Sequence, residues 1–237
     1  MAKLVWDQTG EKYFETGVSN GVLFVYDNNA YKTGVAWNGL TAVTESPSGA
    51  ESTPLYADNI KYLNLVSAEE FGGTIEAYMY PDEFMACDGS INVAPGLHIG
   101  QQARKTFGMV YKTIHGTDTD PEAYYKIHII YGALAAPSEK AYSTVNDSPE
   151  AITFSWEFST TPVAFTDDAN KDYKPVSVIT INSKDFADAE TTGKSLKANL
   201  TALENYLFGA EEVEPTLPNP DQVINLIKTG TLTGAAA

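Results

Sequence analysis

The chain has 237 residues, of which 43% are hydrophobic and 11% aromatic, enough for one large domain or two small ones; this composition argues against global disorder. It carries 31 acidic and 15 basic residues, a formal net charge of −16, so it lacks the basic footprint that nucleic-acid binding requires. The single cysteine, Cys87, excludes an intrachain disulfide and a cysteine-based zinc site, and no apolar run reaches the ~18 residues of a membrane span.

The first third of the chain predicts β-strands separated by turns. Its first ten residues contain no apolar segment typical of a secretory signal, so we expect folding in the cytosol. An apolar run over 21–26 predicts the first strand. Asn38-Gly39 stands between apolar runs over 31–37 and 40–44 and predicts a hairpin, because both residues tolerate positive φ. The polar stretch over 45–54 predicts a loop tip.

The middle of the chain predicts further strands around one short helix. Pro81 at the first helical position, acidic residues after it and Gly89 beyond it predict one or two helical turns over 81–87. Strands are predicted at 61–66, 74–80, 106–114, 123–134, 151–159 and 176–181. This spacing, with turn residues between the runs, predicts a mainly β fold, a β-sandwich or barrel of antiparallel strands.

The C-terminal part predicts one flanking α-helix and then an extended arm. Leucines recur at four, three and four residues from Leu196 to Leu207, which gives one apolar stripe on a helix over 194–208, with Gly209 as its cap. Prolines at 215, 218 and 220 remove hydrogen-bond donors and predict an extended arm, apart from a short segment over 223–227. The expected domains are therefore 1–210, the β domain, and 211–237, the C-terminal arm.

Side chains that could carry chemistry are present but form no strong motif. Asp118, Asp120 and Glu122 alternate in a turn and could offer oxygens to Ca²⁺, but the EF-hand spacing is absent, which favours a solvated hairpin tip. The three histidines are scattered, and His128 stands in a predicted strand, which favours a packed side chain. Cys87 follows an apolar turn and is expected to be buried. No catalytic, cofactor-binding or metal residue is predicted.

Four stretches, in their order and spacing, resemble the major tail (tail tube) proteins of siphophages of Gram-positive hosts. They are YPDEFMACDG at 80–89, YYKIHIIYGALAAPSEK at 124–140, DSPEAITFSWEFSTTPV at 147–163, and YLFG at 206–209 with LPNP at 217–220. The likeness spans about residues 1–228. It implies a β-sandwich or barrel with a flanking helix, a long hairpin loop and terminal arms. Proteins with this resemblance form hexameric rings that stack into the tail tube.

The resemblance also implies which surfaces make contacts. A hairpin loop over 38–59 would reach the next ring, and the C-terminal arm would contact a neighbouring subunit. The candidate inter-ring residues are Asn38, Gly39, Glu45, Pro47, Glu51 and Pro54, and the candidate arm residues are Pro215, Leu217 and Pro218.

The partners implied are copies of the same chain, followed by the tape measure, tail terminator and distal tail proteins. DNA would pass through an acidic lumen without specific binding, since a wall of like charge does not adsorb it. No membrane and no cofactor are implied. The protein would assemble in the host bacterial cytoplasm and reside in the virion tail; a phage-derived bacteriocin particle would use the same tube.

Three other classes of protein stay open. Another virion β-sandwich protein, such as a capsid decoration or receptor-binding module, would share this composition. A carbohydrate-binding module is suggested by the 14 tyrosines and 3 tryptophans, but it needs exposed aromatic side chains on one sheet face. A hydrolase with paired carboxylates needs a spacing that we do not find. The aromatic residues expected mostly in the core are Trp37, Trp156, Tyr124, Tyr125 and Tyr131.

Overall fold

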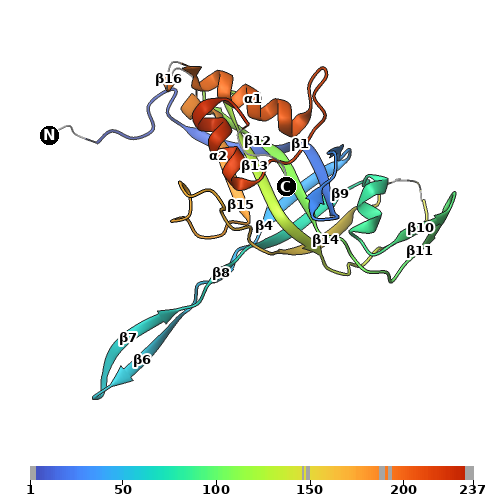
Figure 1. The fold of residues 1–237 in the computed structure, drawn as a ribbon, viewed down its shortest axis with the longest axis horizontal. Helices are drawn as coiled ribbons and strands as arrows, with labels where there is room; N and C mark the ends of the chain where they lie inside the picture. The colour runs from blue at the N-terminus through green and yellow to red at the C-terminus, as the bar shows by residue number, and fades with distance from the viewer. Residues whose placement is uncertain (1–3, 146, 148–149, 187–189, 192–193, 233–237) are drawn as a thin grey trace.

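The computed structural model describes residues 4–145, 147, 150–186, 190–191 and 194–232 and shows a mainly β fold with two helices on one side (Figure 1). The strands of the main sheet are β1 (Tyr13–Asp27), β2 (Ala30–Tyr31), β3 (Val35–Ala36), β4 (Leu40–Glu45), β9 (Gly72–Ala77), β12 (Phe107–Thr117), β13 (Tyr124–Ala135), β14 (Phe154–Thr160) and β15 (Val178–Asn182). The separate strand pairs are β5 (Ser48–Gly49) with β8 (Glu69–Glu70), β6 (Ser52–Ala57) with β7 (Ile60–Val66), β10 (Ile91–Ala94) with β11 (Leu97–Ile99), and β16 (Glu190–Thr191) with β17 (Lys194–Ser195). The helices are α1 (Leu196–Phe208) and α2 (Pro220–Thr229), and 3-10 turns span Asp82–Ala86 and Ser183–Phe186.

The main sheet is antiparallel and curls over on itself. Its order is β2-β1-β12-β13-β14-β9-β4, with β15 beside β13 and β3 beside β1. The end strand β4 comes back to face β1 across an open cleft of about 330 Å³, lined by side chains that include Thr16, Val18, Thr41 and Val43. The predicted fold class, antiparallel strands in a sandwich or barrel with a flanking helix, is confirmed.

Two cores lie on opposite sides of the central strands. Because side chains alternate along a strand, Phe107, Met109 and Tyr111 of β12 point into an inner core with Trp156, enclosed by the curled sheet. Val110 between them points the other way, into an outer core beneath α1 and α2. Strands buried on both faces need apolar side chains at nearly every position, which explains the continuous apolar runs of β12 and β13.

The helix α1 packs its leucine stripe onto the sheet as predicted. Leu200, Leu203 and Leu207 are buried in the outer core, and Gly209 follows the helix with φ +80°. The helix α2 packs against α1. It begins with a capping box, in which the Asn219 side chain accepts from the backbone of Gln222 and the Gln222 side chain accepts from the backbone of Asn219.

A buried carboxylate ties α2 to the loop that precedes β15. Asp221 is 6% exposed, and its oxygens accept hydrogen bonds from the Thr166 backbone at 2.7 Å, the Thr166 hydroxyl at 3.0 Å, the Asp167 backbone at 3.2 Å and the Asn170 amide at 2.9 Å. Burial raises the pKa of Asp221, but these donors outweigh it, so the pKa lies below its ordinary value. The carboxylate therefore stays ionised and holds the loop in place.

The predicted extended C-terminal arm is wrong for the part of 211–237 that the structure describes. The Pro215 carbonyl accepts from the Gly34 backbone at 2.8 Å, Leu217 is 8% exposed in the outer core, and the Pro218 carbonyl accepts from the Tyr131 hydroxyl at 2.9 Å. Residues 220–229 are the helix α2. The prolines do not prevent this helix, because Pro220 stands at its first position, where no backbone donor is needed.

The predicted Asn38-Gly39 hairpin is also wrong. A turn does occur there, with Gly39 at φ +81°, but β3 pairs with β1 and β4 pairs with β9. The turn instead carries the chain from one part of the sheet to another, and the Gly39 carbonyl accepts from the Tyr78 backbone at 2.8 Å. The strand predicted over 21–26 is β1, which starts eight residues earlier at Tyr13, and the run over 31–37 forms the two short strands β2 and β3. The other predicted strands, the helical turns over 81–87 and the helix over 194–208 are confirmed, with boundaries shifted by up to three residues.

Candidate assembly surface

A long hairpin, residues 46–71, leaves the body between β4 and β9 and is here named the arm (Figure 1). Its neck is the pair β5–β8, and its outer part is the hairpin β6–β7. The tip residues Asp58 and Asn59 have φ of 50° and 63°, the two positive values of the tightest hairpin turn. The arm starts where the Ser46 backbone donates to Gly72 at 2.8 Å, so it continues the β4–β9 ladder outward.

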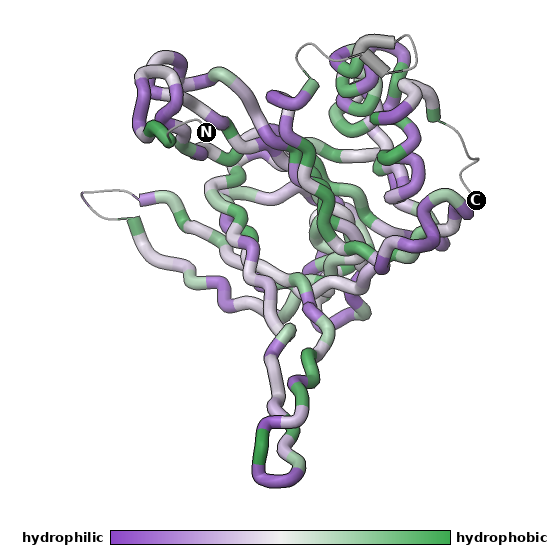
Figure 2. Tube along the Cα trace, turned by 90° about the vertical axis from the view of Figure 1, so that its left-hand side faces the viewer, coloured by the Kyte–Doolittle hydropathy of each residue, from purple (hydrophilic) through white to green (hydrophobic). Residues whose placement is uncertain are grey.

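The arm exposes apolar side chains that no other residue described by the structure covers. Every residue of β6 and β7 is exposed, and none belongs to either core. The pairs Leu55↔Leu63 and Thr53↔Leu65 place three leucines on one face. Figure 2 shows hydrophobic segments along the arm, outside the body. Because exposed apolar surface of this extent marks sites of protein contact, the arm is the first candidate for an interface.

The residues predicted to contact the next ring divide between the arm and the body. Pro47, Glu51 and Pro54 lie on the arm and are exposed. Asn38 and Gly39 lie in the turn before β4, and Glu45 ends β4, so these three are not on the projecting segment. The projecting segment is therefore 46–71 rather than the predicted 38–59, because the sequence showed the turn at Asn38-Gly39 but not the pairing of β4 with β9.

The predicted contacts of the C-terminal arm are corrected for the same reason. Leu217 and Pro218 are buried, and Pro215 is half-buried against its own subunit. A neighbouring subunit therefore has no access to Leu217 or Pro218 in this arrangement.

Four described strands of the main sheet pair with one neighbour each: the two-residue strands β2 and β3, and the longer strands β4 and β15. Among the described strands, β4 pairs only with β9, and β15 pairs only with β13. An open edge presents unpaired backbone donors and acceptors, which another chain can complete. The edges of β4 and β15 are thus the second candidate for contacts between subunits.

Glu45 belongs to a polar cluster at the open end of the inner core. The Tyr111 hydroxyl donates to Glu45 at 2.6 Å, and His128 Nδ1 lies 3.2 Å from the same carboxylate oxygen. The rings of Tyr111 and His128 stack with their centroids 4.7 Å apart. His128, and after it the Tyr111 hydroxyl, lowers the pKa of Glu45 against the effect of burial. Glu45 therefore links β4 to β12 and β13.

A second carboxylate joins this cluster from β1. Glu15 pairs with Lys126 and accepts from the Thr113 hydroxyl at 2.6 Å, and its nearer oxygen lies 3.8 Å from His128 Nε2. Burial raises the pKa of Glu15, but Lys126 and Thr113 outweigh it and lower the pKa overall. Glu15 and Glu45 are both held ionised, whereas paired-carboxylate hydrolysis needs one protonated acid. The cluster therefore fits a brace between strands better than an acid–base pair.

The other residues with possible chemistry have structural partners. Asp118 accepts from the Gly10 backbone at 2.9 Å and so ties the N-terminal segment to the turn between β12 and β13. Asp120 accepts from the Glu122 backbone at 3.1 Å within that turn. Burial raises the pKa of Cys87 to about 12, which keeps the thiol protonated. Over the ranges that the structure describes, no group of three histidine, cysteine, aspartate or glutamate residues is placed to hold a metal ion.

The five aromatic residues expected mostly in the core are at least partly buried. Trp37, Trp156 and Tyr131 are buried, and Tyr124 and Tyr125 are half-buried. Trp37 and Trp156 are therefore unavailable as the flat platform that a carbohydrate-binding module requires, whereas Trp6, outside the described strands, is exposed. Of the helices in the described parts of the chain, none combines the length and the apolar character needed to cross a bilayer.

Comparison with known proteins adds little. No family model matches the chain, and no curated protein matches it. Among solved structures, one match is a chain from the "Cryo-EM structure of the anti-feeding prophage (AFP) baseplate, 6-fold symmetrised". The alignment covers 76% of the present chain and 97% of the baseplate chain, with 8% sequence identity and a TM-score of 0.34. A TM-score of 0.34 is too low to assign a fold or a function to this chain.

Proposed function

We propose that this chain is a structural subunit of a phage-type tail, which assembles into stacked hexameric rings and forms the tail tube, and that it is not an enzyme. The observation that carries the proposal is the arm, a hairpin that exposes apolar side chains away from both cores of its own subunit. A two-stranded hairpin is marginally stable by itself in water, so a partner surface is needed to fix it. The sequence resemblance to tail tube proteins supports a second copy as that partner.

The open edges of the sheet suggest how a ring closes. A contact between the edge of β4 on one subunit and the edge of β15 on the next would be head-to-tail, and head-to-tail contacts close into rings when the rotation permits. Backbone pairing would then continue from subunit to subunit around the lumen. The arm would remain free of this ring and would contact the ring stacked on it.

The surplus of acid supports the proposed passage of DNA. With a net charge of −16 per subunit, a lumen wall that shares this excess repels phosphates and does not retain the genome. Changing several lumen-facing acidic residues to lysine should slow DNA passage and leave assembly intact. Unchanged infectivity in such variants would remove the electrostatic part of the proposal. The proposed partners at the tube ends are the tape measure, tail terminator and distal tail proteins, within a virion or a related bacteriocin particle.

Electron microscopy of concentrated protein tests the proposal directly. We expect rings or tubes, and sedimentation should show particles whose amount rises steeply above a critical concentration. A variant in which residues 52–66 are replaced by a two-residue turn should keep the melting temperature of the intact chain, since β6 and β7 belong to neither core, but should no longer stack. A protein that stays monomeric at every concentration would show that the proposal is wrong.

A further inference from the structure

The hairpin β10–β11 is a second apolar surface, and none of its residues belongs to either core in the described parts of the chain. Ile91 pairs with Ile99 and Ala94 with Leu97, while Val93 stands at an irregularity between the two pairs. Alternation places Ile91, Leu97 and Ile99 on one face. Val93 is the extra residue of the irregularity beside them, and each of the four is 40–55% exposed. The opposite face carries the pair Asn92↔His98. This hairpin is therefore amphipathic, with its apolar face uncovered.

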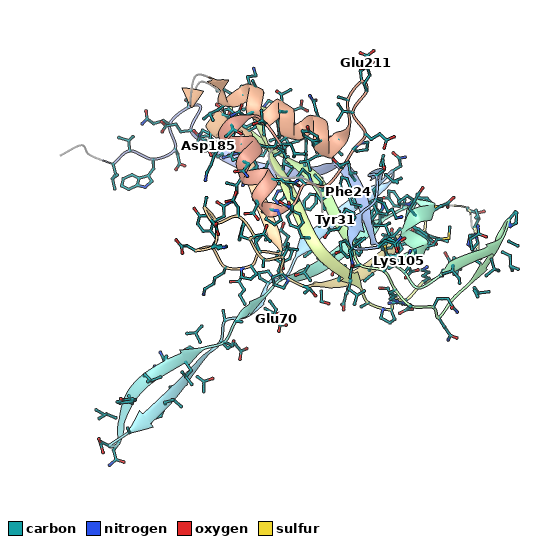
Figure 3. The ribbon with its side chains drawn as sticks, in the orientation of Figure 1. Phe24, Tyr31, Glu70, Lys105, Asp185 and Glu211 are labelled. Carbon is teal, nitrogen blue, oxygen red and sulfur yellow. The ribbon has the colours of Figure 1, made fainter. Side chains whose placement is uncertain are left out.

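The charge around β10–β11 differs from that of the rest of the molecule. No acidic residue occurs from 89 to 117, in a chain that has 31 of them. Lys105 lies on the side of the body from which β10 and β11 project (Figure 3). Its side chain is 43% exposed and forms an ion pair with Asp27 at 3.0 Å. The two strands of this hairpin thus add no acidic side chain of their own against an acidic partner.

The arm is acidic as well as apolar. Glu51, Asp58, Glu69 and Glu70 lie on it against a single basic residue, Lys61. Figure 3 shows Glu70 where the arm leaves the body. If two arms met each other, these acids would be brought together and would oppose the contact. A partner without acidic residues suits the arm better than a second arm does.

The two hairpins leave the body in opposite directions, the arm to the lower left and β10–β11 to the right (Figure 1). They cannot meet within one chain, but they can meet between two copies. Such a contact joins two different surfaces and leaves one of each free, so it repeats along a stack.

We propose that the apolar face of β10–β11 receives the arm of a second copy of this chain. The leucine face of the arm and the Ile91–Ile99 face would cover each other, with polar side chains left on the outer sides. The inference rests on the proposed self-assembly and names the surface that the arm contacts.

Crosslinking between two single-cysteine variants tests the contact. Leu65→Cys on the arm and Val93→Cys on β10–β11 are mixed under conditions in which electron microscopy shows assembled particles, and the mixture is treated with a short thiol crosslinker. Any dimer that joins the two variants is intermolecular. The native Cys87 is buried and is not expected to react, and the unaltered protein measures its background. The matched control pair is Asn64→Cys with Asn92→Cys, which lie on the opposite faces of the same two hairpins.

The expected result is that the 65/93 pair yields about tenfold or more crosslinked dimer than the 64/92 pair, because a contact raises the effective concentration to on the order of millimolar. Particles that form without this excess would overturn the inference and leave the proposed function intact. Crosslinking of Leu65→Cys mainly to itself would also overturn the inference. A protein that neither assembles nor crosslinks would overturn both the inference and the proposed function.

Discussion

Replacing Gly49 in the neck of the arm by alanine should weaken assembly without weakening the fold. Gly49 has φ +79°, a left-handed conformation that costs a residue with a side chain about 1–2 kcal/mol. An added Cβ would also lie 2.4 Å from the Ala68 carbonyl oxygen, well inside van der Waals contact. The neck has only the two pairs Ser48↔Glu70 and Gly49↔Glu69, so it must open or turn the arm away.

If the arm contact requires the native neck, 1–2 kcal/mol corresponds to an increase in the critical concentration of about 5–30-fold for each contact. Sedimentation across a concentration series measures this shift, and a thermal melt measures the fold. The melting temperature should stay the same, since the neck belongs to neither core. Gly10→Ala is the control: Gly10 also has a positive φ of +87°, but its added Cβ would meet only the Thr119 hydroxyl at 3.9 Å. An unchanged critical concentration for Gly49→Ala would refute the reasoning.

Four further results are expected. Asp221→Asn should lower the free energy of unfolding at pH 7 by about 2–4 kcal/mol in urea titrations, because the new amide group donates where the carboxylate accepts. The control, Asp172→Asn at an exposed position, should change the free energy of unfolding by less than about 0.5 kcal/mol. The pKa of Asp221 in the folded protein lies below the ordinary value of 3.8, so its contribution to the free energy of unfolding is complete above pH 3.8 and is lost as the pH falls through the folded pKa. The difference in free energy of unfolding between the native protein and Asp221→Asn should therefore shrink in acid. A difference that stays constant would contradict this account. Leu217→Ala should cost about 2–4 kcal/mol, and a loss within experimental error would show that the segment after α1 is not docked. Thiol reagents at pH 8 should leave Cys87 unmodified in the native protein and modify it in denaturant, since its pKa is raised to about 12; rapid native labelling would contradict its burial. Hydrogen exchange should slow in 46–71 on assembly and stay the same in 215–229, whereas equal protection of the arm in monomer and assembly would argue against its role as a contact.

The candidate surface was only partly predictable from the sequence. The polar stretch over 45–54 predicts a loop tip, whereas the structure has the strands β5 and β6 there and the turn at Asp58-Asn59. That Pro47, Glu51 and Pro54 project from the body is implied, at the level of the sequence, by the resemblance alone. The arm's second strand was predicted as an ordinary strand, since an apolar run such as Ile60–Val66 has the same pattern whether it is buried or exposed. The apolar face of β10–β11 was missed for a related reason: its strands are short and are interrupted at Val93.

Buried polar residues were also beyond the reach of local patterns. Asp221 follows a proline in an acidic region and looks solvated, yet it is buried because four donors from 166–170 converge on it. Asn199 stands beside the leucine stripe of α1 and is 1% exposed, because its amide donates to the Ile227 carbonyl of α2 at 2.9 Å. The partners of both residues come from distant parts of the chain, which no spacing rule relates.

The sequence by itself determined the mainly β class, the positions of most strands and the amphipathic helix over 194–208. These follow from alternation in strands and from the 3.6-residue period of helices, which are properties of neighbouring residues. Only the tertiary structure decided that β4 pairs with β9, that the segment around Leu217 packs into the outer core, and that the arm begins at residue 46. Strand pairing and burial depend on contacts between residues far apart in the chain, where several arrangements suit the same local pattern and the packing of the two cores selects one.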